Sequence, residues 1–301
     1  MIERYFQFLG EDQTKQLLDA NEKPLTPSIR ANTLKIEIET LKNRLENKGF
    51  MLEPIDWIPY GFKVKKAPLN LGSTHEYLQG FYYLQSVAPM LPAFILNPNP
   101  SDIVIDMCAA PGGKATHLAQ IMNNDGNLIL IERNRNRIPA LELNIRRMGV
   151  SNSIVINQDA VNLSKMNLKA DKILLDAPCT GEGLIRQDSS RKRSKTMKDI
   201  NKLSNIQRNL LRTGLNSLNP GGQLLYSTCS IAPEENELVI DDVLKDNSDF
   251  AIVKIPSNYG VDGIIDVYNK TLREDIKYSQ RLYPHLHNTI GFFISLIEKV
   301  K

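Results

Sequence analysis

Short apolar runs alternate with amphipathic stretches through the second part of this 301-residue chain, and this alternation constrains the fold more than any other feature. Five runs have the length and apolar character of buried strands: 103–107, 128–132, 153–159, 172–179 and 223–229. The stretches between them, for example 135–148 and 199–218, have helical spacing. Nearly continuous apolar strands separated by helices predict a parallel sheet covered by helices on both faces.

The first hundred residues have a different pattern. Residues 27–35 predict a short strand, residues 38–49 a helix and residues 57–64 a second extended segment, which together form a small β-α-β unit. The turn-rich segment LNPNPSD, residues 96–102, precedes the alternating region. We therefore predict two domains: a small N-terminal α+β unit, residues 1–75, and a larger α/β domain, residues 76–301.

Composition sets broad limits on the function. The formal net charge of +3 permits a nucleic-acid partner without requiring one. Three cysteines cannot form a disulfide framework, which favours a reducing compartment. The start of the chain lacks the features of a signal peptide, and the apolar stretches 87–96 and 290–297 are shorter than the roughly 18 residues of a membrane span. We therefore expect a cytoplasmic protein without membrane contact.

Chemically useful side chains follow several of the predicted strands. In sheets of this kind, ligands bind beyond the carboxyl ends of the strands. The side chains expected at that edge are Cys108, Glu132, Asp159, Asp176, Cys179 and Cys229. This coincidence predicts that the ligand site lies at the carboxyl edge of the sheet.

The segment DMCAAPGGKATHLAQ, residues 106–120, has the pattern of a strand, a glycine-rich turn and a helix. Glycines allow a ligand close to the backbone, and the first turn of a helix offers unpaired N–H groups. A phosphate-binding P-loop is disfavoured, because Cys108 replaces its first glycine and Ala115 its magnesium-binding hydroxyl. The Gly-x-Gly-x-x-Gly dinucleotide fingerprint is absent from this segment.

Two acids support a nucleoside cofactor instead. Glu132 lies 20 residues after Gly112, where a carboxylate usually holds ribose hydroxyls. Asp159 is predicted to end the third strand and to meet an adenine amino group. The alternative is that each acid merely caps a helix. This explanation is less plausible when it has to account for both acids beside the same loop.

Cys179 and Cys229 are predicted to end two neighbouring strands, and the helix after Cys229 is predicted to begin at Pro233. A thiol near a helix N-terminus ionises more readily, and the thiolate is the reactive form. A single strand-end cysteine is more often a small buried apolar residue, and zinc binding is disfavoured because neither cysteine belongs to a Cys-x-x-Cys pair. The pair His285 and His287 is more often structural than metal-binding. Two thiols beside a cofactor cleft favour covalent catalysis.

Several of these motifs resemble those of the Nop2/Sun family of RNA 5-methylcytosine methyltransferases. They are DMCAAPGGK, LDAPCTGEG and YSTCSIAPEENE, together with PSIRANTLK, GFYYLQSVAPM and RLYPHLHNTIGFF. The resemblance therefore covers nearly the whole chain, and its compact form is similar to that of the archaeal tRNA members. One departure is Glu132, where the family often has Asp, and either carboxylate can hold a ribose.

The resemblance implies a Rossmann-like methyltransferase fold that binds S-adenosylmethionine, preceded by a small RNA-binding domain, with no metal. It implies catalytic roles for Cys229, Cys179, Asp176 and Lys114. The implied cofactor-binding residues are Cys108, Ala109, Ala110, Pro111, Gly112, Gly113, Lys114, Glu132, Arg137, Asp159 and Asp176.

The implied mechanism is covalent. Cys229 adds to carbon 6 of cytosine, and carbon 5 then attacks the methyl group of the cofactor. Asp176 hydrogen-bonds the ring edge, Lys114 orients the base, and Cys179 assists removal of the proton from carbon 5. The target base has to leave any stack to reach these groups.

RNA contacts are expected at two places. Residues 186–212 contain nine Lys or Arg and two Asp, centred on residues 191–195, so they are either a phosphate-tracking loop or a solvated face. In the N-terminal unit, Arg30, Asn32, Trp57 and Tyr60 are candidates for stacking or shape contacts.

Two other classes of function remain as rivals. A small-molecule or protein methyltransferase would have the same fold, but transfer to oxygen or nitrogen needs no covalent adduct and so does not explain two thiols. A non-catalytic RNA-binding assembly factor would have been favoured by the loss of either cysteine, and both are present. We expect tRNA as the substrate, rRNA as the alternative, and a monomer as the simplest assembly.

Overall fold

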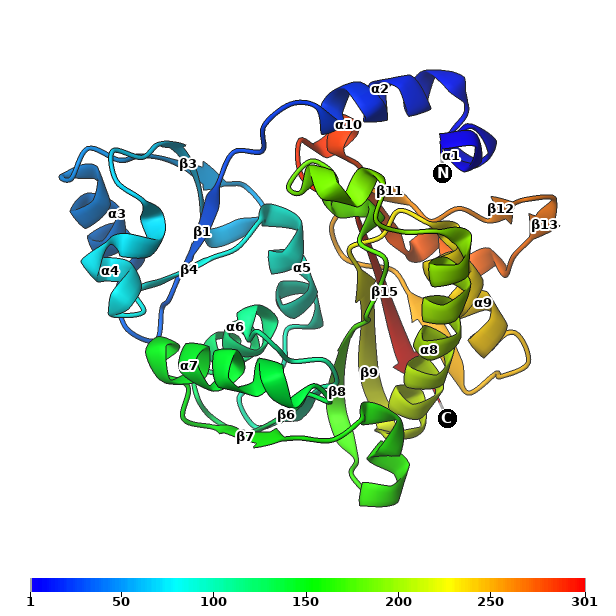
Figure 1. Cartoon of the computed structure of the whole chain (residues 1–301). Helices are drawn as coiled ribbons and strands as arrows, with labels where there is room; N and C mark the ends of the chain where they lie inside the picture. The colour runs from blue at the N-terminus through cyan, green and yellow to red at the C-terminus, as the bar shows by residue number, and fades with distance from the viewer. Residues whose placement is uncertain (1, 301) are drawn as a thin grey trace. The chain divides into compact units, whose positions relative to one another are not determined.

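A computed structural model describes residues 2–300, and it divides into two compact units (Figure 1). One unit is the segment Thr26–Ala160, and the other combines the segments Met1–Leu25 and Val161–Lys301, apart from the undescribed residues 1 and 301. The two helices before residue 26 thus pack with the second half of the chain. The predicted functional domains, with their boundary after residue 75, stay a prediction.

The unit formed by residues 26–160 contains a small antiparallel sheet. Its strand order is β2 (Met51–Ile55), β3 (Ile58–Lys66), β1 (Ser28–Ala31) and β4 (Tyr82–Leu84). The helices α3 (Ile38–Glu46) and α4 (His75–Leu78) and the short turn η1 (Leu71–Ser73) accompany it. The predicted strand, helix and extended segment are present. The β-α-β interpretation is wrong in that β1 pairs antiparallel with β3, which the chain reaches through the β2–β3 hairpin.

The same unit contains three parallel strands: β5 (Ile103–Asp106), β6 (Asn127–Ile131) and β7 (Ser153–Ile156). Its further helices are α5 (Val87–Leu96), α6 (Gly113–Ile121), η2 (Arg135–Arg137) and α7 (Ile138–Met148). Strand β7 ends three residues before Asp159, so the prediction that Asp159 ends the third strand is wrong. The polar residues Asn157 and Gln158 follow the last strand residue, and Asn157 bonds to the carbonyl of Glu132.

The other unit has a mixed sheet in the order β11 (Val261–Asp262), β14 (Gln280–Leu282), β15 (Phe292–Lys299), β9 (Leu218–Thr228) and β8 (Ala170–Asp176), and β10 (Phe250–Val253) pairs with β15. Only β8 and β9 among these are parallel, so the expectation of a wholly parallel sheet is wrong here. Strands β14 and β15 are joined by only nine residues, 283–291, which is shorter than the dozen or more that a parallel crossover needs, so the chain returns in the opposite direction.

Helices and turns surround this mixed sheet. The helices are α1 (Ile2–Leu9), α2 (Glu11–Asn21), α8 (Met197–Asn216), α9 (Glu237–Leu244) and α10 (Pro284–His287). The short 3-10 turns are η3 (Ala160–Met166), η4 (Glu182–Leu184), η5 (Ser189–Lys192), η6 (Pro233–Glu235) and η7 (Glu274–Tyr278), and β12 (Asp266–Val267) pairs with β13 (Lys270–Thr271). Figure 1 shows α8 lying along β8 and β9, and α2 beside α10.

Local sequence explains the principal elements of this unit. Helix α8 begins with a capping box in which Thr196 and Asp199 satisfy each other's backbone N–H groups, and its buried face includes Ile200 and Leu211. The apolar run of β9 is buried from Leu224 to Thr228. Because Asp176 lies opposite Ser227 in the parallel β8–β9 pair, both strands end at the same edge of the sheet. The segments that follow the two strands therefore meet.

Candidate active site

The two predicted catalytic cysteines lie side by side at this edge. Cys229 follows the last residue of β9 directly, and its Sγ lies 3.0 Å from the Sγ of Cys179. Both are free, half-buried thiols. Cys179 lies three residues beyond β8, so the prediction that it ends the strand is wrong, although the predicted pairing of the two strands is confirmed.

The thiol of Cys179 is hard to deprotonate. The hydrogen bond with Cys229 and the burial of the thiol raise the pKa of Cys179 well above its usual value, and the nearby Glu235 and Asp176 carboxylates add to the effect. The two sulfurs are within hydrogen-bond distance, and either thiol can be the donor.

Asp176 is the last residue of β8, and the Oγ of Ser227 donates a hydrogen bond to its Oδ1 at 2.9 Å. Ser227 comes from the facing position of β9. The carboxylate is therefore oriented by the neighbouring strand, on the same edge as the two sulfurs.

The segment carrying Cys179 is held by Glu235, a buried carboxylate in η6. Glu235 accepts hydrogen bonds from the backbone N–H and the hydroxyl of Thr180, at 2.8 and 2.5 Å. It also accepts from Nε2 of Gln207, which donates in addition to the carbonyl of Pro178 at 2.8 Å. Sequence reasoning missed Glu235 and Gln207 as site residues, because a Pro-Glu-Glu sequence is typical of any first helical turn.

Gly183 joins the two segments through the backbone. Its N–H donates to the carbonyl of Cys229 at 2.9 Å, and its carbonyl accepts from the N–H of Gly291 at 2.9 Å. A Cβ atom at position 183 would lie 2.1 Å from the carbonyl oxygen of Gly291. Only glycine therefore allows this close approach.

The turn after Cys229 differs from the predicted helix start. Residues Pro233–Glu235 form a single 3-10 turn, and α9 begins at Glu237. Asn236 closes the turn: it accepts a hydrogen bond from the Thr228 hydroxyl at 2.6 Å and donates to the carbonyl of Ser230 at 2.9 Å. The predicted effect of a helix N-terminus at Pro233 on the Cys229 thiol is therefore not supported.

In the unit formed by residues 26–160, the glycine-rich loop lies between β5 and α6, as predicted. The Cys108 N–H donates to Oδ1 of Asp106 at 3.1 Å, and the Ala109 N–H donates to the carbonyl of Ile131 at 3.0 Å. Gly112 has a φ of 106°, a conformation that residues other than glycine rarely adopt. A Cβ atom on Gly113 would lie 3.3 Å from the ring of Tyr83.

Glu132 and Arg137 are bound to this loop. Glu132 is buried directly after β6 and accepts hydrogen bonds from the Asn134 N–H at 2.7 Å and from Nη1 of Arg137 at 3.3 Å. Nη2 of Arg137 donates to the carbonyl of Ala110. Arg137 thus connects the strand-end carboxylate with the loop.

The other two predicted site residues of this unit are half-buried. The Asp159 carboxylate lies 3.9 Å from Nη1 of Arg133. Lys114 is on the first turn of α6.

Two residues expected to contact RNA are structural instead. Arg30 is completely buried, and its guanidinium donates to the carbonyl of Gly113 at 2.7 Å and to the hydroxyl of Thr116 at 2.9 Å. Asn32, also buried, donates to the carbonyls of Gly80 and Met148, both at 2.8 Å. The expectation of RNA contacts from Arg30 and Asn32 is therefore wrong, and Arg30 instead fixes the start of α6.

Tyr60 and Trp57 are half-buried, and the Tyr60 hydroxyl lies 2.7 Å from Nε2 of His117. Burial lowers the pKa of His117 well below its usual value, so this imidazole stays neutral. Stacking of these two aromatic residues on RNA stays a prediction.

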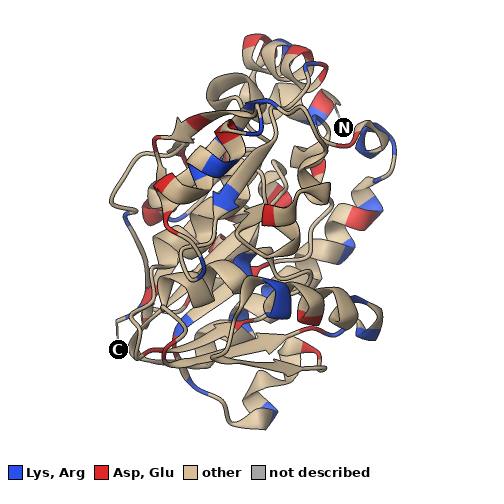
Figure 2. Cartoon of the chain, turned by 90° about the vertical axis from the view of Figure 1, so that its left-hand side faces the viewer, with Lys and Arg blue, Asp and Glu red and all other residues tan. Residues whose placement is uncertain are grey.

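Part of the basic segment 186–212 is neutralised within its own unit. Arg191 lies 3.2 Å from Asp188, Lys192 lies 2.5 Å from Glu22, and Arg208 lies 2.7 Å from Asp242. Arg193 and Lys198 are exposed. Figure 2 likewise shows Lys and Arg interspersed with Asp and Glu along helices and loops. The charge available to a polyanion is therefore smaller than the sequence count implies.

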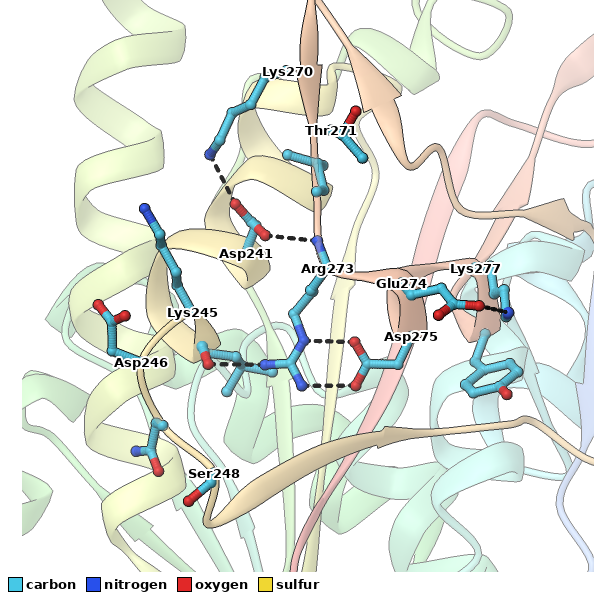
Figure 3. A pocket seen from close by; sticks show the side chains of 14 residues that line it. Asp241, Lys245, Asp246, Ser248, Lys270, Thr271, Arg273, Glu274, Asp275 and Lys277 are labelled. Atoms are coloured by element: carbon cyan, nitrogen blue, oxygen red, sulfur yellow. Dashed lines mark hydrogen bonds and ion pairs between the residues drawn. The ribbon is translucent and has the colours of Figure 1, made fainter.

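A polar pocket of about 870 Å³ lies between α9 and the segment 270–278 (Figure 3), and none of the predicted site residues lines it. Three of its cations are paired: Arg273 with Asp275, Lys270 with Asp241 and Lys277 with Glu274. The pocket contains neither cysteine and has compensated charge, so it is not the candidate active site.

The side chains of His285 and His287 are hydrogen-bonded to other residues of the protein. Nδ1 of His287 accepts from the Tyr283 N–H at 3.0 Å, and Nε2 of His285 lies 2.7 Å from Oε1 of Gln13. Among the described residues, no cluster of three or more His, Cys, Asp or Glu side chains has a metal-binding arrangement. Within residues 2–300, no helix is both long enough and apolar enough to span a bilayer.

Comparison with known proteins identifies the family. Residues 93–298 match the family described as 16S rRNA methyltransferase RsmB/F. The chain belongs to the RsmB/F family of Nop2/Sun RNA cytosine-5 methyltransferases. Residues 1–87 match the N-terminal domain of 16S rRNA methyltransferase RsmF. The predicted family resemblance is thus confirmed over nearly the whole chain.

Relatives of this RsmB/F member differ in their substrates. The 25S rRNA (cytosine-C(5))-methyltransferase nop2 of Schizosaccharomyces pombe is 37% identical over 100% of this chain and 50% of its own length. The tRNA (cytosine(49)-C(5))-methyltransferase of Pyrococcus abyssi is 35% identical over 99% of this chain and 95% of its own. The chain spans half or less of the rRNA relatives from S. pombe, Caenorhabditis elegans and Mus musculus.

Solved structures confirm the fold. A methyltransferase homolog protein from Pyrococcus horikoshii has a TM-score of 0.90 and 42% identity, covering 99% of this chain and 93% of that one. NSun6 from P. horikoshii, solved with SFG, has a TM-score of 0.89 and 27% identity, covering 100% and 97%. The predicted Rossmann-like methyltransferase fold with an additional N-terminal domain is therefore correct.

Proposed function

We propose that this RsmB/F member transfers a methyl group from S-adenosylmethionine to carbon 5 of cytosine in RNA, through a covalent adduct on Cys229. The observation that carries the proposal is the sulfur pair: Cys179 and Cys229 lie 3.0 Å apart, and their contact raises the pKa of Cys179. Transfer to oxygen or nitrogen needs no such pair, and a non-catalytic assembly factor would need neither thiol.

The residues of the loop between β5 and α6 fit a nucleoside cofactor. Gly112 has a φ of 106°, which gives the loop a sharp turn, and the buried carboxylate of Glu132 is held by a backbone N–H and by Arg137. In this proposal Glu132 binds ribose hydroxyls, Asp159 contacts the base of the cofactor, and the backbone of residues 108–114 contacts the remainder. When bound, the cofactor supplies an electrophilic methyl group.

In the first half of the reaction, the Cys229 thiolate forms a bond to carbon 6 of cytosine. This breaks the conjugation of the ring and makes carbon 5 nucleophilic, so that carbon 5 accepts the methyl group. Asp176, oriented by Ser227, hydrogen-bonds the ring edge and stabilises a proton on the adjacent ring nitrogen. Lys114 orients the base.

In the second half, Cys179 first loses its own proton to solvent and then accepts the proton from carbon 5. The bond between carbon 6 and Cys229 breaks, which restores the aromatic ring and the free thiolate. The pKa of Cys179 is consistent with this order of events. Before the adduct forms, the hydrogen bond with Cys229 is the largest cause of the raised pKa of Cys179. Adduct formation removes this cause because the sulfur of Cys229 is then bound to carbon, and Cys179 becomes easier to deprotonate and so available as a base.

We propose tRNA as the substrate, because the tRNA (cytosine(49)-C(5))-methyltransferase of P. abyssi is 35% identical over 99% of this chain. Ribosomal RNA is the second candidate, since three relatives named for rRNA are 37% to 38% identical over 94% or more of this chain. Both candidates use the same chemistry at the cysteine pair.

The two cysteines have opposite roles, which gives the first prediction. Cys229→Ala cannot form the adduct, so it should be inactive and should give no RNA–protein species that survives denaturation. Cys179→Ala should still attack and methylate, but should accumulate a covalent complex with methylated RNA, visible as a slow band on a denaturing gel.

Cys108→Ala is the matched control, since this third thiol has no covalent role. Trapping should require the cofactor and should vanish in the double variant Cys179→Ala/Cys229→Ala. A trapped complex in Cys229→Ala with none in Cys179→Ala would reverse the roles. Full turnover in both single variants would contradict the covalent mechanism.

A further inference from the structure

Arg4, on the N-terminal helix α1, makes three hydrogen bonds to two carboxylates far away in the sequence. Its Nε and Nη2 donate to the two oxygens of Glu234 at 3.0 and 2.6 Å, and its Nη1 donates to Oε1 of Glu182 at 3.0 Å. The Arg4 side chain is 12% exposed and that of Glu182 is fully buried. This is the forked geometry in which arginine recognises carboxylates most strongly.

Glu182 belongs to the segment that carries Cys179. Among the contacts that anchor this segment are Thr180 on Glu235, Gly183 on the carbonyl of Cys229, and Glu182 on Arg4. The first two anchors come from residues that follow β9. Arg4 is the anchor that comes from the N-terminal helix.

The buried carboxylate of Glu182 depends on the positive charge of Arg4. Burial raises the pKa of Glu182, and the charge and hydrogen bond of Arg4 oppose that rise. Oε2 of Glu182 is buried and has no hydrogen-bond partner among the described residues. Without Arg4, a buried carboxylate would have to take up a proton or leave its position.

The position of Arg4 is itself fixed by packing. The next residue, Tyr5, is buried in a cluster with Leu17, Ile231 and Tyr283. Ile231 lies two residues after Cys229, so α1 packs on the segment that follows the nucleophile. The guanidinium therefore has a defined place relative to both cysteine segments.

We propose that Arg4 is a positioning residue for catalysis: by holding Glu182 it keeps Cys179 in place for the step that releases the methylated base. This inference rests on the proposed function, since it assigns Arg4 to the release step of that reaction. Arg4 contacts neither cysteine and acts through Glu182.

The test uses four proteins: the wild type, Arg4→Met, Glu182→Gln and the double variant. The rate of adduct formation and the rate of release are measured separately with RNA and S-adenosylmethionine. Arg4→Met should slow release by about tenfold and change adduct formation much less. Its defect should grow as the pH rises, because unpaired Glu182 then ionises. In the double variant this growth should disappear, since glutamine carries no charge.

Two further variants separate positioning from folding. Arg4→Lys keeps the charge and should retain more release activity than Arg4→Met. Lys15→Met is the matched control, because it removes a cation whose partner Glu11 lies on an exposed helix face.

Absence of an adduct in the wild type would overturn the proposed function, and this inference with it. An adduct in the wild type, combined with an unchanged release rate and pH profile in Arg4→Met, would overturn the inference alone. A lower unfolding temperature in Arg4→Met without those kinetic changes would mean that the ion pair is merely structural.

Discussion

At the scale of single residues, the proton on Cys179 is the feature with the most direct chemical consequence. Two thiols 3.0 Å apart cannot both ionise easily, because the second negative charge would lie beside the first. The acids Asp176 and Glu235 lie near Cys179 and raise its pKa further. This raised pKa fits the proposed division of roles, in which Cys229 is the nucleophile and Cys179 acts later.

This assignment predicts the pH dependence of release. Because Cys179 has to lose its proton before it can accept another from carbon 5, release should accelerate as pH rises, by up to about tenfold per pH unit below the pKa that Cys179 has in the adduct. The measurement is the decay of preformed adduct at a series of pH values. In Cys179→Ala the slow residual decay should lack this dependence. A pH-independent decay in the wild type would contradict the role of Cys179.

At the scale of elements, the segments after β8 and β9 are joined by side chains from α8 and η6 and by the backbone of Gly183. The next part of the chain, from η5 into α8, carries the basic run. There Arg191 and Lys192 are already paired with Asp188 and Glu22, whereas Arg193 and Lys198 are exposed. The exposed cations are therefore the better candidates for phosphate contacts.

Neutralisation of the exposed cations should weaken RNA binding. The variant is Arg193→Gln/Lys198→Gln. The slope of the logarithm of RNA affinity against the logarithm of salt concentration should become shallower by about 0.7 to 0.9 for each phosphate contact that the variant loses. The matched control Arg191→Gln/Lys192→Gln should change the slope less, since it removes charges that acids already compensate. Fluorescence anisotropy over a range of salt concentrations measures both. An equal slope in all three proteins would mean that this run is a solvated face.

At the scale of the whole molecule, the net charge of +3 provides little general attraction for RNA, so recognition has to come from local features of the chain. The match to the RsmF N-terminal domain over residues 1–87 and to the RsmB/F family over residues 93–298 covers most of the chain. The similarity to the tRNA relative from P. abyssi, which extends over 99% of this chain, is the basis of the tRNA proposal.

Deletion of the gene should therefore remove 5-methylcytosine from tRNA and leave it in ribosomal RNA. Bisulfite sequencing of total RNA from the deletion strain measures this, and the wild-type gene should restore the modification where a Cys229→Ala gene does not. Loss confined to ribosomal RNA would replace the tRNA proposal and retain the chemistry. Unchanged methylation in every RNA would argue against the activity itself.

The sequence by itself determined the alternation of strands and helices between residues 103 and 229, the loop between β5 and α6, and the position of Cys229 after a strand. These features depend on short-range periodicity and turn chemistry, which are local properties of the chain. The roles of the two cysteines came from the family resemblance, because residue spacing alone left a buried structural cysteine possible.

Only the tertiary structure decided which groups meet. It placed the two sulfurs in contact, showed β15 antiparallel to β9, and buried Arg30 and Asn32 against their own unit. It also revealed that Glu235 and Arg4 hold the segment of Cys179. Strand register and side-chain packing bring together residues that lie far apart in sequence, such as Arg4 and Glu182, which are 178 positions apart, and no local pattern encodes such a pairing.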